Sequence, residues 1–333
     1  MSGRLSLRSH PWLMDHRIRN TALLPGTAFV ELLLSAGREL GCDGLDELLL
    51  RDPLLLPMDG SAVEVQVSVE PANAEGARPA AIFSRPVGEK SWLRNADGIL
   101  ADANTAVPPL EADVSVMAGA VELPAEGLYT DLLDLGYGYG EAFQGVRSGA
   151  HEGDWAHSRI VLPEAARVNH RGFAIHPALV DAALHAAVRC GLLGEAAAGN
   201  ISVPFIFSGV RIGQDPEKVA ADQCYAVARR VAPDAITLTL ADDDGRLLLS
   251  VDRMVVRGLA LPGPLRTSTR PHCMRWRGTR SPARRARTEQ AARTARTPRS
   301  TVCASSPVTT ARSRKLCARP HAAGSRSPPS TRR

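Results

Sequence analysis

The chain of 333 residues contains no long apolar run. A transmembrane helix needs about 18 or more consecutive apolar residues, and no stretch of this sequence approaches that length. The first residues, MSGRLSLRSHPW, also lack the apolar centre of a secretory signal peptide. These absences argue against a membrane-spanning or secreted protein, and we expect a cytoplasmic location.

Cysteine is scarce and has no informative spacing. Metal sites and disulfide frameworks need clustered cysteines, and this chain has no C-x-x-C pair. The sequence therefore predicts neither a disulfide framework nor a zinc site, and no ligand spacing suggests another metal or a redox cofactor. Cys190 is expected to be a small buried residue within a helix. The six cysteines are Cys42, Cys190, Cys224, Cys273, Cys303 and Cys317.

Charge is distributed unevenly along the chain. From residue 259 onward there are 18 Lys and Arg residues and a single acid, Glu289, whereas the preceding part holds 22 basic and 34 acidic residues. This segment has almost no Leu, Ile or Val and cannot build a core, so residues 261–333 are predicted to form a disordered basic tail. Nucleic-acid binding is not expected, because Trp276 is its only aromatic residue for stacking on bases. A slipped reading frame in GC-rich coding sequence would produce the same composition.

An apolar stretch at residues 15–40 predicts a central helix. Pro25 suits the first helical position, and Gly41 is expected to close the helix. A helix this apolar is expected to be wrapped by other elements, which would place His16 near its positive N-terminal end. The apolar residues at helical spacing are Ala28, Phe29, Leu32, Leu33, Ala36 and Leu40.

A second apolar stretch, residues 175–194, repeats this pattern. Pro177 opens the predicted helix and glycines follow it. Asp181 and His185 are four residues apart and therefore share one helical face. Two such helices suggest a duplicated fold unit, in which an acid on one helix could meet a histidine beside the other.

Alternating residues predict antiparallel strands after each helix. In residues 62–70, AVEVQVSVE, every second residue is valine, as in a half-buried strand. The segment ADDDGR at 241–246 contains Asp-Gly and predicts a hairpin turn. A helix followed by strands that curl round it is a hot-dog arrangement. Further strands are predicted at 80–85, 91–101, 155–163, 223–231, 235–241 and 246–259.

Four short motifs occur in a specific order. His16 and Pro25 fit H-x3-G-x4-P, with Asn20 in the glycine place, and residues 136–145 read GYGYGEAFQG, with Glu141 where proline is usual. The motif HPALVDAALH runs from His176 to His185, and VPFIFSGV follows at 203–210. Together these motifs resemble the dehydratase domains of modular type I polyketide synthases, from about residue 3 to about residue 260.

This resemblance implies an α+β fold, the double hot-dog, in which two antiparallel sheets are each wrapped round a central helix. We expect an N-terminal half at residues 1–102, a linker at 103–125, a C-terminal half at 126–260 and the basic tail at 261–333. It also implies a homodimer, with an acyl carrier protein and other polyketide synthase domains as partners.

The resemblance implies dehydration of a 3-hydroxyacyl thioester to an α,β-unsaturated thioester. The substrate would be carried on the phosphopantetheine of the carrier protein, and the domain itself would bind no cofactor. His16 is the expected base for the α-proton, and Asp181 is the expected acid, kept protonated by apolar surroundings.

Supporting roles are also implied by the resemblance. Tyr139 and His185 would orient Asp181 by hydrogen bonds, and Tyr139 could also contact the substrate hydroxyl. Residues Pro25 and Gly26 are expected to bind the substrate, because amides at the start of a helix can stabilise charge on the thioester carbonyl. His176 is expected to be structural.

Departures from the family pattern leave alternatives open. Asn20 tolerates left-handed backbone and is expected to preserve the turn. Glu141 would loosen a turn beside Tyr139 and add a charge near the site, and Ile206 and Phe207 would alter a wall of the pocket. The alternatives are a silent or truncated structural dehydratase domain and a double-bond-shifting or ring-forming relative.

Overall fold

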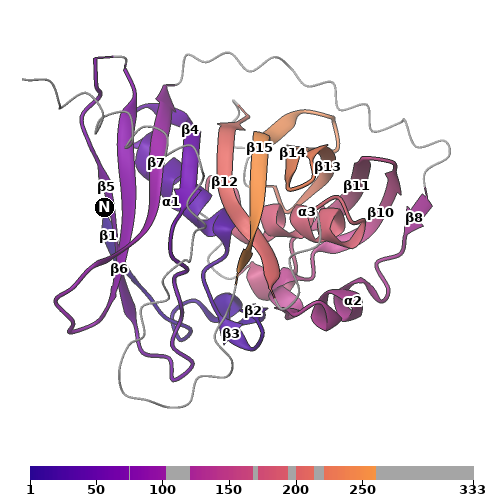
Figure 1. Cartoon of the computed structure of the whole chain (residues 1–333), viewed down its shortest axis with the longest axis horizontal. Coiled ribbons are helices and arrows are strands. Elements are labelled where there is room, and N and C mark those ends of the chain that lie inside the picture. Colours follow the sequence, from indigo (N-terminus) through magenta and orange to yellow (C-terminus); the bar gives the residue numbers. More distant parts are fainter. Residues whose placement is uncertain (75, 103–120, 168–171, 194–199, 214–220, 260–333) are drawn as a thin grey trace, which may run out of the picture. The chain divides into compact units, whose positions relative to one another are not determined.

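Two buried helices lie side by side against antiparallel strands in the computed structural model of the chain (Figure 1). The structure describes residues 1–74, 76–102, 121–167, 172–193, 200–213 and 221–259. The central helices are α1, Gly26–Arg38, and α3, Pro177–Arg189.

Helix α1 lies close to its predicted position but is shorter at both ends than the sequence predicts. Pro25 is the residue before the helix, with extended backbone angles, so the first helical residue is Gly26. The helix ends at Arg38, and Gly41 has the positive φ of 76° that lets the chain turn into the next strand. Leu40 therefore lies beyond the helix and is 45% exposed, although its spacing predicts a place on the apolar face.

Helix α3 begins at Pro177, as its sequence predicts. The Nδ1 atom of His176 accepts a hydrogen bond from the backbone N–H of Ala178 at 3.1 Å, which caps the helix. The prediction that Cys190 lies within the helix is wrong by one residue. Cys190 follows Arg189 as the C-terminal cap and is half-buried, because Gly191 ends the helix with a φ of 66°.

The N-terminal half contributes five strands, in the spatial order β1-β5-β6-β7-β4. The alternating valines behave as expected in β5, where Val63, Val65 and Val67 are buried. The strands are β1 Ser2–Leu5, β4 Cys42–Leu50, β5 Val63–Val69, β6 Arg78–Pro86 and β7 Leu93–Asp102.

The C-terminal half contributes seven strands, in the order β12-β15-β14-β13-β11-β10-β8. Strand β8 pairs with β10 and lies at the end of the predicted linker, whose residues 103–120 are outside the described part. These strands are β8 Val121–Leu123, β10 Val146–Glu152, β11 Trp155–Val161, β12 Ile201–Ile212, β13 Gln223–Ala232, β14 Ala235–Ala241 and β15 Leu247–Leu259.

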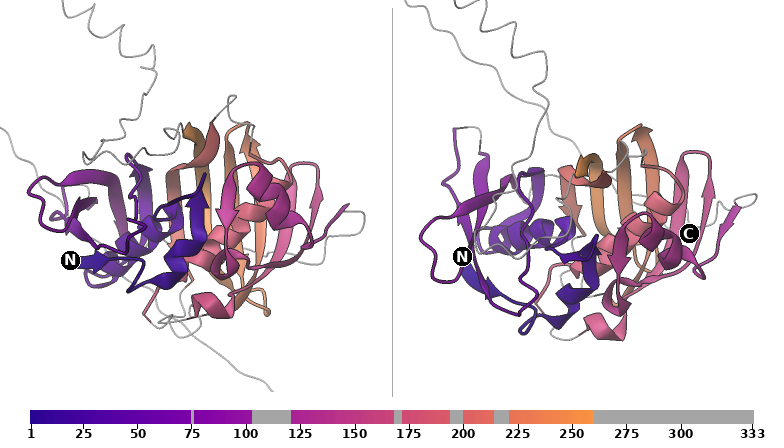
Figure 2. Two further views of the ribbon diagram at one scale, coloured as in Figure 1. Left: turned by 90° about the horizontal axis from the view of Figure 1, so that it is seen from below. Right: turned by 60° about the horizontal axis from the view of Figure 1, so that its bottom comes forward.

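Pairing of β4 with β12 joins the halves into one twelve-stranded antiparallel sheet. Helix α1 packs on β4, β5 and β7, and α3 packs on β10, β11 and β13 (Figure 2). Each half-sheet thus has its own central helix, as the double hot-dog prediction requires. The predicted tail, 261–333, lies outside the described residues.

A smaller sheet of three short strands, in the order β3-β2-β9, lies beside the large one. Of the helices in the described residues, none is both long and apolar enough to cross a membrane. The remaining elements are β2 His16–Ile18, β3 Thr21–Ala22, β9 Tyr137–Tyr139, α2 Leu128–Asp134, and the short 3-10 helices η1 Pro11–Asp15, η2 Glu141–Phe143 and η3 Glu164–Ala166.

Candidate active site

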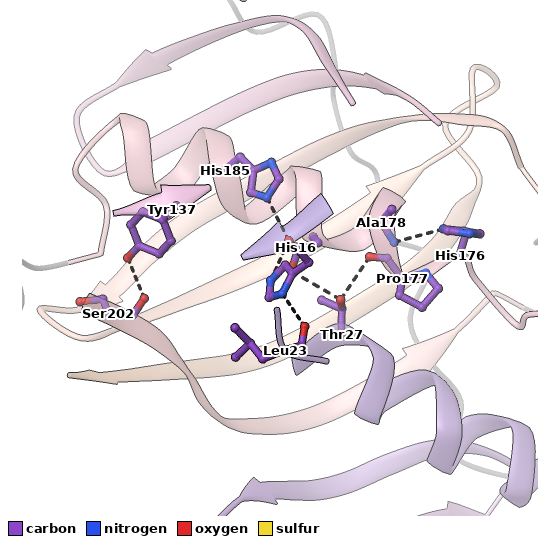
Figure 3. Close-up of polar contacts among 10 residues, drawn as sticks. His16, Leu23, Thr27, Tyr137, His176, Pro177, Ala178, His185 and Ser202 are labelled. Atoms are coloured by element: carbon purple, nitrogen blue, oxygen red, sulfur yellow. Dashed lines mark hydrogen bonds and ion pairs between the residues drawn. The ribbon is translucent and has the colours of Figure 1, made fainter. Parts of the chain in front are cut away.

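The small sheet brings the two halves of the chain together at His16. Strand β2 pairs antiparallel with β9, and in this register His16 lies opposite Tyr139. Helix α3 brings Asp181 to the same histidine, with 3.8 Å between His16 Nε2 and Asp181 Oδ2. His16 and Asp181, which are far apart in the sequence, thus meet at one buried point. Figure 3 shows His16 near His185, which lies on the same helix as Asp181.

The protonation of His16 follows from its backbone contact. Its Nδ1 atom lies 2.9 Å from the carbonyl oxygen of Leu23. Because a carbonyl only accepts, Nδ1 carries the hydrogen, and in the neutral ring Nε2 holds a lone pair directed toward Asp181. Burial lowers the pKa of His16, and this outweighs the opposite effect of the nearby Asp181 carboxylate. The ring is therefore a neutral base at neutral pH.

Asp181 is buried and has polar neighbours on both carboxyl oxygens. His185 Nε2 donates to Oδ2 at 2.9 Å, and the Thr27 hydroxyl lies 3.5 Å from Oδ1. Burial raises the pKa of Asp181, but His185, His16 and Thr27 together hold this pKa below its ordinary value. The direction of this shift is opposite to the one that the sequence predicts for Asp181 in apolar surroundings, because the polar partners outweigh the burial.

His185 and Tyr139 act on Asp181 in different ways. His185 makes the expected hydrogen bond, whereas the Tyr139 hydroxyl makes none with Asp181 among the described residues. Instead, the Tyr139 ring packs on the His185 ring, with 3.8 Å between centroids. Burial raises the pKa of Tyr139, so its hydroxyl stays protonated at neutral pH. The Tyr139 ring thus packs against His185 and lies 5.7 Å from the His16 ring, between ring centroids.

A pocket with about 750 Å³ of empty volume, including open solvent, reaches this cluster. His16, Tyr139 and Asp181 line it together with a largely apolar wall. Of the two residues that are expected to bind the substrate, Gly26 lines the pocket and Pro25 does not. The wall includes Ile18, Leu23, Leu24, Phe29, Leu50, Leu184, Val188, Leu193, Val203, Pro204, Met254, Val256 and Leu259.

Two side chains leave little space for a larger residue at Gly26. A Cβ atom at this position would lie 3.1 Å from Leu50 Cδ1 and 3.2 Å from Pro204 Cβ. As the first residue of α1, Gly26 also has an amide without a partner inside the helix. An oxygen atom of a ligand can accept from such an amide at the positive end of the helix.

Asp15 has a structural role that the sequence did not reveal. Its Oδ2 atom accepts from the backbone N–H of Ala142 at 2.9 Å, and its carbonyl accepts from Gly140 at 2.9 Å. A Cβ atom on Gly140 would overlap the Asp15 carboxyl group, so this close approach requires glycine. Asp15 thereby fixes the chain directly after Tyr139.

Glu31 is a second residue without a predicted role. It is buried in α1 and accepts hydrogen bonds from the backbone amides of Ala174 at 2.7 Å and Ile175 at 3.1 Å. Ser35 donates to it at 2.8 Å. Burial raises the pKa of Glu31. A lone acid within an apolar helix is the signal that could have identified this anchor for the segment leading into α3.

The departures from the family pattern have small local consequences. Asn20 has a φ of 67°, in the left-handed region that Asn tolerates, so the predicted turn is present. Glu141 opens η2 and its side chain is exposed to solvent. Ile206 and Phe207 do not line the pocket, and Phe207 is packed in the core. The expectation that these two residues alter the pocket wall is therefore wrong.

Family models match both halves of the chain. The model described as "Polyketide synthase dehydratase domain" matches residues 1–85, and the model described as "Polyketide synthase dehydratase N-terminal domain" matches residues 108–264. Among curated proteins, polyketide synthase GfsA of Streptomyces halstedii is 39% identical over 264 residues. The match covers 77% of this chain and 3% of GfsA, so the chain spans only a small part of that relative.

Solved dehydratase domains are similar to this chain in both fold and sequence. The dehydratase domain from the terminal module of the rifamycin polyketide synthase is 35% identical, with a TM-score of 0.68, covering 77% of this chain and 89% of that domain. The bifunctional dehydratase-cyclase domain in ambruticin biosynthesis is 33% identical and has the same TM-score of 0.68. This match covers 78% of this chain and 90% of that domain. The chain therefore belongs to the dehydratase domains of modular type I polyketide synthases.

Proposed function

We propose that the chain is a hydro-lyase that removes water from a 3-hydroxyacyl thioester during polyketide elongation. The observation that carries this proposal is the separation of 3.8 Å between His16 Nε2 and Asp181 Oδ2 at one point of an apolar pocket. A base and an acid this close reach neighbouring carbon atoms of one substrate from the same side. The elimination is therefore expected to be syn.

His16 is the proposed base. Its Nε2 lone pair takes the α-proton while Nδ1 keeps its hydrogen bond to Leu23, so the ring does not turn during the step. The electron pair of the broken C–H bond becomes the new double bond. Charge that builds up on the thioester carbonyl is stabilised by the amide of Gly26 at the start of α1.

Asp181 is the proposed acid that protonates the leaving hydroxyl group. The acyl chain displaces water from the pocket, which disfavours the carboxylate and favours the protonated form needed for this step. After elimination the proton is on His16 and Asp181 is ionised. The proton returns to Asp181 directly or through the departing water, since only 3.8 Å separates the two atoms.

The proposed partners follow from the family. The substrate is carried on the phosphopantetheine of an acyl carrier protein, and further polyketide synthase domains supply and receive it. A homodimer is also proposed, because β1 is the end strand of the described sheet and an edge strand can pair with a second copy. Size-exclusion chromatography with light scattering on the full chain tests this, and a monomer across micromolar concentrations would contradict it.

Ring formation is the second candidate function, because the dehydratase-cyclase domain in ambruticin biosynthesis is 33% identical. Such a reaction would add a substrate hydroxyl across the new double bond without a further change in mass. A substrate with a distal hydroxyl group distinguishes the two reactions. A cyclase product shows the mass of the dehydrated thioester but lacks the ultraviolet absorption of a conjugated enoyl thioester.

The full chain should remove one water from a 3-hydroxyacyl thioester on a carrier protein. Mass spectrometry of the carrier protein measures this loss of mass. Both 3-hydroxyl configurations and several chain lengths belong in the test. His16→Ala and Asp181→Asn should each lose at least about a hundredfold in rate, since each general acid or base is worth about 10²–10⁴-fold. A folded wild type without turnover on any of these substrates would overturn the proposed function in favour of a silent domain.

A further inference from the structure

Thr27 connects the two central helices directly at the candidate acid. It is the second residue of α1, and its side chain is buried. Its hydroxyl oxygen lies 3.1 Å from the carbonyl oxygen of Pro177 and 3.5 Å from Asp181 Oδ1, both on α3 (Figure 3). The hydroxyl therefore has two possible acceptors on the helix that carries the acid.

The donor count limits what this hydroxyl can do. A threonine hydroxyl has one hydrogen, whereas a carbonyl oxygen and an ionised carboxylate only accept. Thr27 can thus donate to Pro177 or to Asp181, but not fully to both. A neutral carboxyl group attracts the hydrogen less strongly than a carboxylate, because hydrogen bonds to charged groups are about twice as strong.

The two carboxyl oxygens of Asp181 have different surroundings. Oδ2 accepts from His185 at 2.9 Å and faces His16, so it is the oxygen that exchanges a proton with a ligand in the pocket. Oδ1 faces Thr27, which does not line the pocket. When the proton leaves Oδ2, negative charge spreads over both carboxyl oxygens. The Thr27 hydroxyl lies near Oδ1, the oxygen that does not accept from His185.

We propose that Thr27 is a positioning residue whose hydroxyl turns from Pro177 to Asp181 Oδ1 as the acid loses its proton. This inference rests on the proposed dehydratase function. In the step itself, the O–H bond of Asp181 breaks, its proton joins the leaving hydroxyl, and water departs as the C–O bond breaks. Thr27 keeps its own proton throughout, and it stabilises the carboxylate as that charge develops.

Two substitutions separate the hydroxyl from the shape of the side chain. Thr27→Val keeps the branched shape without the donor, and Thr27→Ser keeps the donor. Thr27→Val should lower kcat by about ten- to a hundredfold, as expected for one hydrogen bond to a charged group, while KM changes less than about threefold. Thr27→Ser should restore most of the rate. Thr239 is a buried threonine on β14 that does not line the pocket. Thr239→Val is therefore the control, because it shows the effect of losing a buried threonine hydroxyl away from Asp181.

The pH profile adds a readout that a packing role would not move. Loss of the donor destabilises the carboxylate and raises the pKa of Asp181. Activity that depends on protonated Asp181 should then persist to higher pH in Thr27→Val than in the wild type or Thr27→Ser. An unchanged kcat and alkaline limb in Thr27→Val, or equal losses in both variants, would overturn the inference.

Infrared spectroscopy at pH 7 tests the contact without turnover. The difference spectrum between the wild type and Asp181→Asn isolates the carboxylate band of Asp181. This band should shift in Thr27→Val and remain in place in Thr27→Ser. If the wild type has no dehydratase activity but the band shifts as stated, the proposed function fails while the contact stands. A band that does not move in Thr27→Val contradicts the contact itself.

Discussion

The imidazole of His16 and the carboxyl group of Asp181 meet at 3.8 Å, although they come from opposite halves of the chain. Strand β2 holds His16 through its pairing with β9, and α3 carries Asp181. Neither half contains both groups. Catalysis by this domain is therefore expected to depend on the contact between the halves as much as on the two side chains.

His185→Phe should lower kcat by about ten- to a hundredfold, because Phe keeps an aromatic ring beside Tyr139 but cannot donate to Asp181. The substitution removes a single hydrogen bond, since Nδ1 of His185 has no hydrogen-bond partner among the described residues. Steady-state kinetics measure this effect. His157→Phe on β11, outside the pocket, is the matched control, and equal kinetics in both variants would argue against an orienting role for His185.

The acid limb of the pH profile should lie below pH 6.5. His16 must be neutral to accept the α-proton, and burial lowers its pKa from the ordinary value of 6.5. In the substrate complex, where Asp181 is proposed to be protonated, the base is lost only when His16 gains a proton, so kcat should not fall between pH 7 and 6.5. The apparent pKa of this limb describes the coupled His16–Asp181 pair rather than either residue alone. An acid limb well above pH 6.5 would contradict a buried neutral base.

Tyr139 offers a way to separate the ring from the hydroxyl. Tyr139→Phe keeps the ring that packs on His185 at 3.8 Å and loses only the donor to a ligand. Tyr139→Ala loses both, so its kcat should fall further than that of Tyr139→Phe, by about two- to tenfold for the added loss of aromatic packing. Comparison of kcat in the two variants tests this order. Equal rates would mean that the ring does not position His185.

Glu31→Gln should destabilise the fold rather than change the chemistry. A glutamine has one acceptor oxygen for the two amides of Ala174 and Ile175, so one buried N–H loses its partner. We expect the free energy of unfolding to fall by about 1–3 kcal/mol in urea titrations. Glu64→Gln affects ion pairs with exposed Arg4 and half-buried Arg85 at the surface of the sheet, and it should have the smaller effect because no buried amide loses its partner. The reverse order would refute the anchoring role of Glu31.

Local pattern was enough to predict the elements that dominate the fold. The spacing of apolar residues located α1 and α3, and alternation located β5, because burial on one face leaves a regular trace in the sequence. The motifs also identified His16, Asp181, His185 and Tyr139 as candidates. Pattern failed at Leu40 and Cys190, because each helix ended one or two residues earlier than the apolar spacing indicates, although the glycine that follows was recognised.

Contacts between distant segments were not predictable in this way. The pairing of β2 with β9, the bond from Ala142 to Asp15, and the place of Thr27 beside Asp181 depend on how the halves pack. The protonation of Asp181 likewise depends on its partners, not on the apolar residues next to it in sequence. A short polar side chain in an apolar helix shows only that some partner must exist.

A double-mutant experiment tests most directly whether His16 and Asp181 act as one unit. The rates of His16→Ala, Asp181→Asn and the double variant are compared with the wild type on one carrier-bound 3-hydroxyacyl thioester. If the two groups work in the same elimination step, the double variant should be about as slow as the slower single variant, because residues that act together are strongly non-additive. Losses that multiply in the double variant would show independent contributions and contradict the proposed pair.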